Sequence, residues 1–285
     1  MPSVRDGGVI SSVQEAVEVA SKFPQPRLGF LVSRGQKKHA WGLQPSVFRE
    51  ERWFKYERHM IRELISAHPQ EFTTDRSMFE KLVRMQHYGL PTRLLDVSSN
   101  FLVSLFFASE EADDGSDGAI YVIRGLNSLR KYYDSDTVSV LANLANLSTI
   151  EKRKILQTKR TNGSVQPDSF NRYDPVDRLL HFIRDEKPYF RPIIQKEHVT
   201  RSYLVVAKKS NRRIVAQSGA FLLFGLVDAR TRTHDMAGFR LTKYRIPAGD
   251  KSDIRRSLNL LGINESSLYP EIDKAARQIT SAYRS

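Results

Sequence analysis

Apolar side chains recur at helical spacing through the first half of the chain. The intervals Glu51–His68 and Arg76–His87 each place their apolar residues on one face of a helix. The interval Asn100–Glu110 is apolar nearly all round, which requires burial on most of its faces, and Ser98 or Ser99 is its predicted N-cap. We therefore predict three helices here, with the third at the centre of the core.

Shorter apolar runs, rich in β-branched and aromatic residues, predict strands. Their bounds are Leu28–Ser33, Ala119–Ile123, Ser202–Ala207, Phe221–Val227 and Phe239–Ile246. Further helices are predicted at Val13–Lys22, Asp136–Asn146, Ile150–Gln157 and Ser252–Leu261, with another opening at Pro270 and a loop at Asn162–Asp168.

The order of these elements predicts one α+β domain. A helical N-terminal half is expected to pack on a mixed or antiparallel sheet core. We expect this domain to occupy residues 28–285, since no linker long enough to separate two domains interrupts them. Residues 1–27 are expected to be a loose lead-in followed by a short helix.

The composition excludes several classes of protein. No cysteine is present, which excludes disulfides, thiolate metal sites and thiol catalysis, and the seven histidines show no metal-ligand spacing. The chain starts without a secretory signal pattern, and no window approaches the roughly 18 apolar residues of a membrane helix. We expect a cytoplasmic protein without membrane contact and without a metal.

The net charge of +13 is concentrated in one part of the chain. Residues 151–213 hold 16 Lys and Arg against 7 Asp and Glu, an excess of 9. A clustered positive field attracts polyanions and releases their counterions, whereas solubility needs no clustering. This distribution favours a polyanionic partner over a merely solvated basic face.

Three polar segments stand out as candidate sites. In Ser33–Gln36, which follows a predicted strand, a glycine beside an arginine would let a ligand approach the backbone while the guanidinium holds a phosphate or ribose. Gln86–Asp96 gathers an imidazole, a phenol, a guanidinium and a carboxylate in what we predict to be a loop between two buried helices. In Arg213–Phe221, Gln217 has the side chain that can both donate and accept.

Each segment also has a structural interpretation. Ser33–Gln36 would suit a surface turn, and Gln217 an ordinary turn. Arg93 and Asp96 would suit an internal ion pair, and His87 a hydrogen bond at a helix end.

Together the segments resemble the FRG domain. The matching stretches, in chain order, are Gly29–Gln36, Leu43–Arg49, Gln86–Ala108, Gly118–Val122, Ile214–Phe221 and Leu258–Ala275. The most specific is QHYGLPTRLLD, which forms Gln86–Asp96. Ser33 departs from the pattern, because an aromatic residue usually precedes the Arg-Gly pair, but the guanidinium is retained.

The resemblance implies a distant relation to ADP-ribosyltransferases, which split NAD and pass ADP-ribose to a target, and a bacterial toxin or phage-defence setting. It implies that NAD is the second substrate and that an acidic antitoxin protein is a partner. The residues assigned to NAD binding on this basis are Arg34, Gly35, Gln36, Tyr88, Thr92 and Arg93, and those assigned to catalysis are Arg34, His87, Asp96 and Gln217. Gln217 stands where that superfamily has a glutamate, and an amide cannot take a proton, so Asp96 is the expected carboxylate.

Four functions stay open from the sequence. The first is an NAD-dependent ADP-ribosyltransferase acting on RNA or DNA, with residues 151–213 as the docking surface. The second is the same enzyme with a protein acceptor. The third is a non-catalytic nucleic-acid or nucleotide-binding module, and the fourth is a metal-independent nuclease that uses His87.

Overall fold

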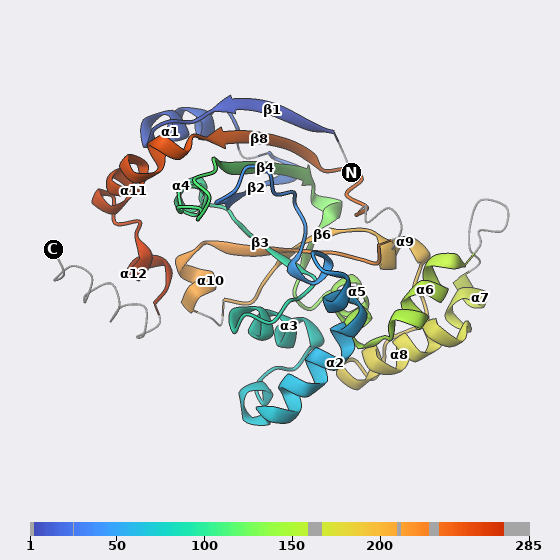
Figure 1. Cartoon of the computed structure of the whole chain (residues 1–285). Helices are drawn as coiled ribbons and strands as arrows, with labels where there is room; N and C mark the ends of the chain where they lie inside the picture. The colour runs from blue at the N-terminus through green and yellow to red at the C-terminus, as the bar shows by residue number, and fades with distance from the viewer. Residues whose placement is uncertain (1–2, 25, 159–166, 210–211, 228–233, 271–285) are drawn as a thin grey trace.

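An eight-stranded mixed sheet organises the molecule (Figure 1). The computed structural model describes residues 3–24, 26–158, 167–209, 212–227 and 234–270. The strands are β1 (Val4–Val9), β2 (Gly29–Gln36), β3 (Leu94–Ser98), β4 (Gly118–Leu126), β5 (Arg130–Tyr132), β6 (Tyr203–Val206), β7 (Gly219–Leu223) and β8 (Arg240–Ile246). Their order is β1-β8-β4-β2-β3-β7-β6-β5, with β1 parallel to β8, β5 parallel to β6 and the other pairs antiparallel.

The sheet is nearly divided in the middle. β2 pairs with β4 along its whole length, and β3 pairs with β7 along its whole length. Between β2 and β3, however, the register holds the single pair Ser33 and Ser98. Beyond that pair the two strands part, so the backbone groups of Arg34–Gln36 on one side and of Asp96 on the other do not pair across the gap.

Twelve helices of the described residues cover the two faces of the sheet. They are α1 (Val13–Ser21), α2 (Glu51–Ala67), α3 (Met78–His87), α4 (Phe101–Ala108), α5 (Asp136–Asn143), α6 (Thr149–Gln157), α7 (Pro167–Asn171), α8 (Asp174–Glu186), α9 (Lys196–Thr200), α10 (Arg212–Ala216), α11 (Lys251–Leu260) and α12 (Glu265–Leu268). In Figure 1, α1, α4 and α11 lie beside the β1-β8-β4-β2 part, and α2, α3, α5, α6 and α8 lie beyond β3 and β6.

The buried hydrophobic residues form two clusters. Alternate residues of β4 explain this division, because successive side chains of a strand point to opposite faces. Tyr121 and Ile123 belong to the larger cluster, which includes residues of α2, α3, α5 and α8. Ile120 and Val122 belong to the smaller cluster, formed with α1, α4 and α11. Both clusters rest on the one sheet, and the prediction of a single α+β domain with a mixed sheet is confirmed.

Most predicted elements are present with bounds shifted by a few residues. Asn100, rather than Ser98 or Ser99, caps α4, since its Oδ1 accepts the Leu102 N–H at 3.0 Å. The predicted loop Gln86–Asp96 also needs correction, because the end of α3 and the first part of β3 fall within it. Strands are not confined to the second half, because β1 to β5 all precede α5.

The start of the chain is more ordered than expected. Residues 4–9 form β1 on the outer edge of the sheet instead of a loose lead-in, while Ser12 caps α1 as a serine at that position predicts. Pro167 and Asp168, expected in a loop, begin α7. The rest of that loop and the helix expected after Pro270 lie outside the described residues. The boundary between residues 27 and 28 stays a prediction.

Candidate functional site

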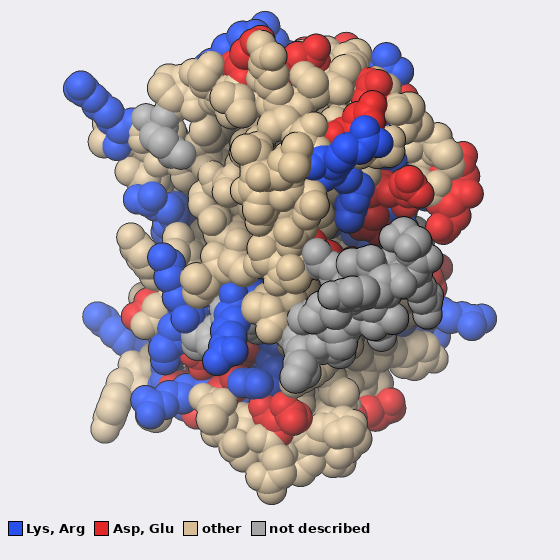
Figure 2. Space-filling model, turned by 90° about the vertical axis from the view of Figure 1, so that its left-hand side faces the viewer, with Lys and Arg blue, Asp and Glu red and all other residues tan. Residues whose placement is uncertain are grey.

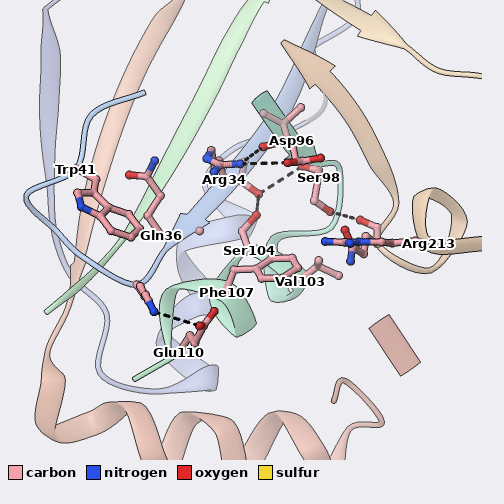
Figure 3. A pocket seen from close by; sticks show the side chains of 15 residues that line it. Arg34, Gln36, Trp41, Asp96, Ser98, Val103, Ser104, Phe107, Glu110 and Arg213 are labelled. Carbon is pink, nitrogen blue, oxygen red and sulfur yellow. Dashed lines mark hydrogen bonds and ion pairs between the residues drawn. The ribbon is translucent and has the colours of Figure 1, made fainter. Parts of the chain in front are cut away.

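A pocket lies where β2 and β3 part, and it collects residues from all three polar segments of the sequence (Figure 3). Its volume is about 240 Å³. Arg34 and Gln36 come from β2, Asp96 from β3, and Gln217 from the turn between α10 and β7. Val103, Ser104 and Phe107 of α4 also line it. The broken strand pairing therefore creates the space, and α4 forms one of its walls.

Arg34 is positioned by the backbone of the opposite strand. Its Nη1 donates to the Asp96 carbonyl oxygen at 2.6 Å and lies 3.9 Å from the Asp96 carboxylate. Its Nε is shielded from solvent and has no hydrogen-bond partner among the described residues. Burial lowers the pKa of Arg34 and Asp96 opposes that shift, while the guanidinium stays charged as arginine does in proteins. An oriented cation with an unused donor is suited to an anionic ligand.

Gly35 has a packing role that the sequence did not suggest. A Cβ added there would lie 1.8 Å from the Ser104 carbonyl oxygen, and one added at Gly118 would lie 2.0 Å from that of Ala108. The two glycines therefore let α4 lie directly on β2 and β4. The helix fills the side of Gly35 on which a Cβ would lie, whereas Gly35 still lines the pocket, so its contact with a ligand stays a prediction.

Gln36 supplies a second unsatisfied polar atom. The residue is 3% exposed, and its Nε2 donates to the Gly42 carbonyl oxygen at 3.2 Å. Its Oε1 has no partner among the described residues. A buried acceptor left without a hydrogen bond carries a desolvation penalty, which a donor on a ligand would remove. Gln36 thus fits the binding role predicted for it.

Several pocket residues were not recognised from the sequence, among them Trp41, Phe107 and Glu110. Trp41 is 39% exposed, and the loop that carries it is fixed by a hydrogen bond of 2.9 Å from the Tyr121 hydroxyl to the Trp41 carbonyl. Phe107 was assigned to the core through the apolar pattern of its helix, yet it lines the pocket. Glu110 lines it just beyond α4, with its carboxylate 3.5 Å from Lys37 Nζ. The pocket therefore has aromatic surface and a second carboxylate.

A buried lysine fixes the end of the pocket that holds Glu110. Lys251 Nζ donates to the carbonyl oxygens of Lys37, Glu110 and Ser116 at 2.8, 3.1 and 2.8 Å. Lys251 is 2% exposed, and burial lowers its pKa. One ammonium thus connects the segment after β2, the segment after α4 and the start of α11, because three donors match three carbonyls.

On the opposite side, the turn after α10 meets the end of β3. Ser98 Oγ donates to the Gln217 carbonyl oxygen at 2.7 Å, and Gln217 Nε2 donates to the Leu268 carbonyl oxygen at 3.1 Å. Arg213 also lines the pocket, with its guanidinium carbon 4.6 Å from the centre of the Tyr269 ring. Gln217 is therefore at the pocket, as predicted, with its amide nitrogen engaged by the backbone.

Asp96 is the predicted catalytic carboxylate, and the structure places it beside Arg34. Its side chain is 56% exposed, and its Oδ2 accepts from Gln86 Nε2 at 2.8 Å. The Gln86 Oε1 in turn accepts from Thr92 Oγ1. Thr92 is 1% exposed and its hydroxyl also accepts the Leu94 N–H at 3.2 Å, so it supports the Asp96 segment from within the protein. This contradicts the prediction that Thr92 contacts NAD.

Arg93 lies inside the protein and not at the pocket. It is fully buried, and its Nε and Nη2 donate to the two Glu57 carboxylate oxygens at 2.9 and 2.6 Å. Lys152 Nζ donates to the same carboxylate at 2.6 Å, and Arg93 Nη1 donates to the Phe224 carbonyl at 3.2 Å. Burial alone would raise the pKa of Glu57, but the two cations lower it to about 2. The prediction that Arg93 binds a phosphate is therefore wrong.

His87 and Tyr88 lie beyond the pocket, at the end of α3. Tyr88 is 59% exposed, and its hydroxyl donates to Glu71 at 3.1 Å. His87 lines two adjoining cavities, and its ring packs edge-on against Tyr88 with centroids 5.1 Å apart. Neither residue lines the pocket of Arg34, so the predicted role of Tyr88 beside the nicotinamide has no geometric support.

The described parts of the basic region 151–213 are not gathered on one surface. In Figure 1, α6, α7 and α8 lie on the right-hand side, whereas α10 lies on the left. Several of its cations already have anionic partners: Lys152 with Glu57, Arg178 with Glu151 and Lys187 with Asp136. The predicted docking surface is therefore divided between separate parts of the molecule.

No helix among the described residues has both the length and the apolar character needed to cross a membrane. Within the same residues, no group of three or more metal-ligating side chains is found.

The fold and the pocket define a single-domain α+β protein with a small pocket between the two parts of its sheet. Residues 30–117 match the family model described as FRG domain, which supports the FRG family for this segment. The matched segment contains Arg34, Trp41, Asp96, Phe107 and Glu110, which are five of the pocket residues. The chain matches no curated protein and no solved structure.

Proposed function

We infer that this protein is an NAD-dependent ADP-ribosyltransferase that modifies nucleic acid. The observation that carries this proposal is the convergence of three separate polar segments on the pocket at Arg34. Two buried polar atoms of the pocket have no partner among the described residues. Arg34 Nε could donate a hydrogen bond to a ligand, and Gln36 Oε1 could accept one. Exposed aromatic surface at Trp41 adds a place for a base or a nicotinamide ring to stack.

The size of the pocket suggests which part of NAD it would enclose. Sites for drug-sized ligands run from about 300 to 1,000 Å³. A volume of about 240 Å³ therefore suits the nicotinamide and its ribose, with the rest of NAD extending past the pocket rim. Arg34 would hold the diphosphate, Gln36 would orient the carboxamide or a ribose hydroxyl, and Phe107 would cover an apolar ring face.

The chemistry is a substitution at the ribose carbon bonded to nicotinamide. That bond breaks, nicotinamide leaves with the bonding electron pair, and an oxygen or nitrogen of the acceptor forms the new bond and gives up its proton. Asp96 would stabilise the positive charge that develops at the ribose and receive the acceptor proton. Glu110 is the other carboxylate that lines the pocket, and its ion pair with Lys37 favours an orienting role. Gln217 would hold a hydroxyl by hydrogen bonding, because an amide takes no proton.

The resemblance to the FRG domain extends the proposal to the biological system in which the activity would operate. The chain would act as the toxin of a toxin–antitoxin or anti-phage system, in the cytoplasm, with an acidic antitoxin opposing its positive charge. A protein acceptor would use the same pocket with a different partner surface. A non-catalytic nucleotide-binding module is the second candidate, favoured by the position of His87 and Tyr88 outside the pocket.

The test is incubation of the folded chain with NAD labelled in its adenosine part, together with RNA, DNA or cell lysate. The proposal predicts label on a polynucleotide and release of nicotinamide, both reduced at least about hundredfold in Arg34→Ala and Asp96→Asn. Label on protein alone would move the acceptor from nucleic acid to protein. Binding of NAD without release of nicotinamide would favour the binding module.

A further inference from the structure

The pocket at Arg34 continues into two further cavities. A small one of about 70 Å³ shares Asp96, Arg213 and Gln217 with it. A larger one of about 470 Å³ shares Val83 and His87 with the small one. Because neighbouring cavities share lining residues, the three lie side by side in a row from β2 past α10 to the end of α3, which we call the groove.

The outer part of this groove has a cationic wall. Lys208 and Arg212 line the larger cavity, both are exposed, and neither forms an ion pair with the described residues. Arg213 follows Arg212 and lines the inner cavities. Figure 2 shows Lys and Arg side chains gathered around a hollow in the lower half of the face that is on the left in Figure 1. Successive cations along a groove match the repeat of charge on a polynucleotide backbone.

The facing wall, formed by α3 and the segment before it, carries acids whose groups are already engaged. Asp75 receives Arg84 Nε at 2.6 Å and Arg84 Nη2 at 2.9 Å. Glu80 accepts the Arg76 N–H at 2.7 Å at the start of α3. These contacts reduce the repulsion that a phosphate would meet there. Among the described residues that line the outer cavity, the cations Arg84, Lys208 and Arg212 outnumber the carboxylates of Asp75 and Glu80, so the cavity keeps a positive excess.

Aromatic side chains line the two outermost cavities of the groove. Tyr88 lines the outer cavity with its ring exposed, and its hydroxyl is fixed by Glu71 at 3.1 Å. At the inner end, Phe107 lines the pocket beside Arg34. Rings that accept stacked bases, set among cations that take phosphates, are the two elements of single-strand recognition. An acidic protein would use the cations but would have no need of an exposed ring held in place.

The geometry points to this groove as the binding site for the acceptor, a single-stranded polynucleotide. Its phosphates lie on Lys208 and Arg212, a base stacks on Tyr88, and the strand leads past His87 and Gln217 to Asp96. Only the role of the strand as acceptor rests on the proposed function, because binding of the strand to the groove requires no NAD.

The experiment measures the affinity of the full chain for fluorescent single-stranded RNA and DNA by anisotropy, without NAD. The groove variant is Lys208→Glu/Arg212→Glu. The matched control is Arg153→Glu/Lys154→Glu, which makes the same change of net charge at exposed positions of α6, inside the basic region but away from the groove in Figure 1. Tyr88→Ala removes the ring and leaves the charges.

We expect the groove variant to weaken binding at least about tenfold and to reduce the dependence of affinity on salt. Tyr88→Ala should weaken binding about fivefold or more with an unchanged salt dependence, and the control should stay within about twofold of the wild type. Equal loss in the groove variant and the control, unchanged binding in the groove variant, or no binding of polynucleotide by the wild type would overturn the inference. Strand binding without nicotinamide release would leave the groove standing and refute the NAD chemistry.

Discussion

Two arginines from the polar segments, Arg34 and Arg93, have the same predicted role and opposite surroundings. Arg34 keeps an Nε without a described partner beside an exposed carboxylate, in a space between two strands that have parted. Arg93 is fully buried, and its contacts with Glu57 and Phe224 engage every nitrogen of its guanidinium. Because a fully buried guanidinium with a hydrogen bond from each nitrogen cannot reach a ligand, the first arginine is suited to binding and the second to stabilising the fold.

The two regions also differ in what surrounds the charge. Around Arg93 lie Lys152, Glu57 and a neutral histidine, His234, whose ring packs between Phe48 and Phe224 with centroids 4.8 and 4.6 Å away. In the pocket of Arg34, by contrast, buried polar atoms have no hydrogen-bond partner among the described residues. Binding sites of this kind leave polar atoms unsatisfied until the ligand arrives, at some cost to the unbound protein.

The largest effect should follow from removing Arg93. We expect Arg93→Ala to lower the free energy of unfolding by about 3–5 kcal/mol, because the buried Glu57 carboxylate would lose its two hydrogen bonds from Arg93 and keep only Lys152. Urea unfolding followed by circular dichroism measures this. Arg34→Ala is the matched control and should lose about 1 kcal/mol or less. Similar losses in the two variants would erase the distinction between the arginines.

The next effect concerns acid stability and belongs to the Arg93 region. Burial, helped by Arg93, lowers the pKa of His234 to about 4. Its pKa in the unfolded chain is about 6.5, so between these values the unfolded state binds more protons. Above pH 6.5 the titration of His234 does not change the free energy of unfolding. As the pH falls from 6.5 to 4, the free energy of unfolding should decrease by about 3 kcal/mol.

Urea unfolding at a series of pH values measures this loss, with His234→Phe as the comparison. The variant should lack this part of the pH dependence, because phenylalanine does not titrate. Parallel curves for the wild type and the variant would show that His234 is not held neutral by its surroundings.

Arg34→Ala should weaken NAD binding while leaving the fold intact. Loss of a charged hydrogen bond to a phosphate is worth about 1.5–3 kcal/mol, which is roughly tenfold to hundredfold in affinity. Isothermal titration of NAD into the two proteins measures it. Arg34→Lys should recover only part of the affinity, because an ammonium lacks the planar fork. Unchanged affinity in Arg34→Ala would exclude it as a ligand-binding residue.

The smallest effect should come from Trp41. We expect Trp41→Ala to weaken NAD binding by about 1 kcal/mol through the loss of a stacking surface, and Trp41→Phe to retain most of it. The control is Tyr189→Ala, since Tyr189 is 96% exposed and does not line the pocket. The same titration distinguishes the variants, and an equal effect of the control would remove Trp41 from the site.

Much of the fold could be predicted because apolar runs and helix caps are local signals. β4, β6 and β8 follow apolar runs with clear bounds, and α1 follows a serine cap. β1 was missed because an edge strand with two glycines and mostly exposed side chains carries no apolar pattern. β5 was missed because three residues are too few to show a period.

The site could be predicted only in part, because its geometry depends on contacts between distant residues. The three segments could be found as polar clusters, yet the parting of β2 from β3 depends on how each strand pairs with its other neighbour, β4 or β7. Arg93 could have been assigned correctly from Glu57, an acid on the apolar stripe of α2, since a carboxylate on a buried helix face needs a cation. Phe107 gave no such signal, because the apolar pattern of a helix that is apolar all round does not show which of its residues line a pocket.

The most direct test of the account is the release of nicotinamide from NAD by the folded chain. The account predicts release by the wild type and a reduction of at least about hundredfold in Asp96→Asn, with circular dichroism unchanged. Glu110→Gln should cause a smaller reduction, because its ion pair with Lys37 assigns it to orientation. No release by the folded wild type, or release that is equal in Asp96→Asn, would contradict the claim that this pocket cleaves NAD.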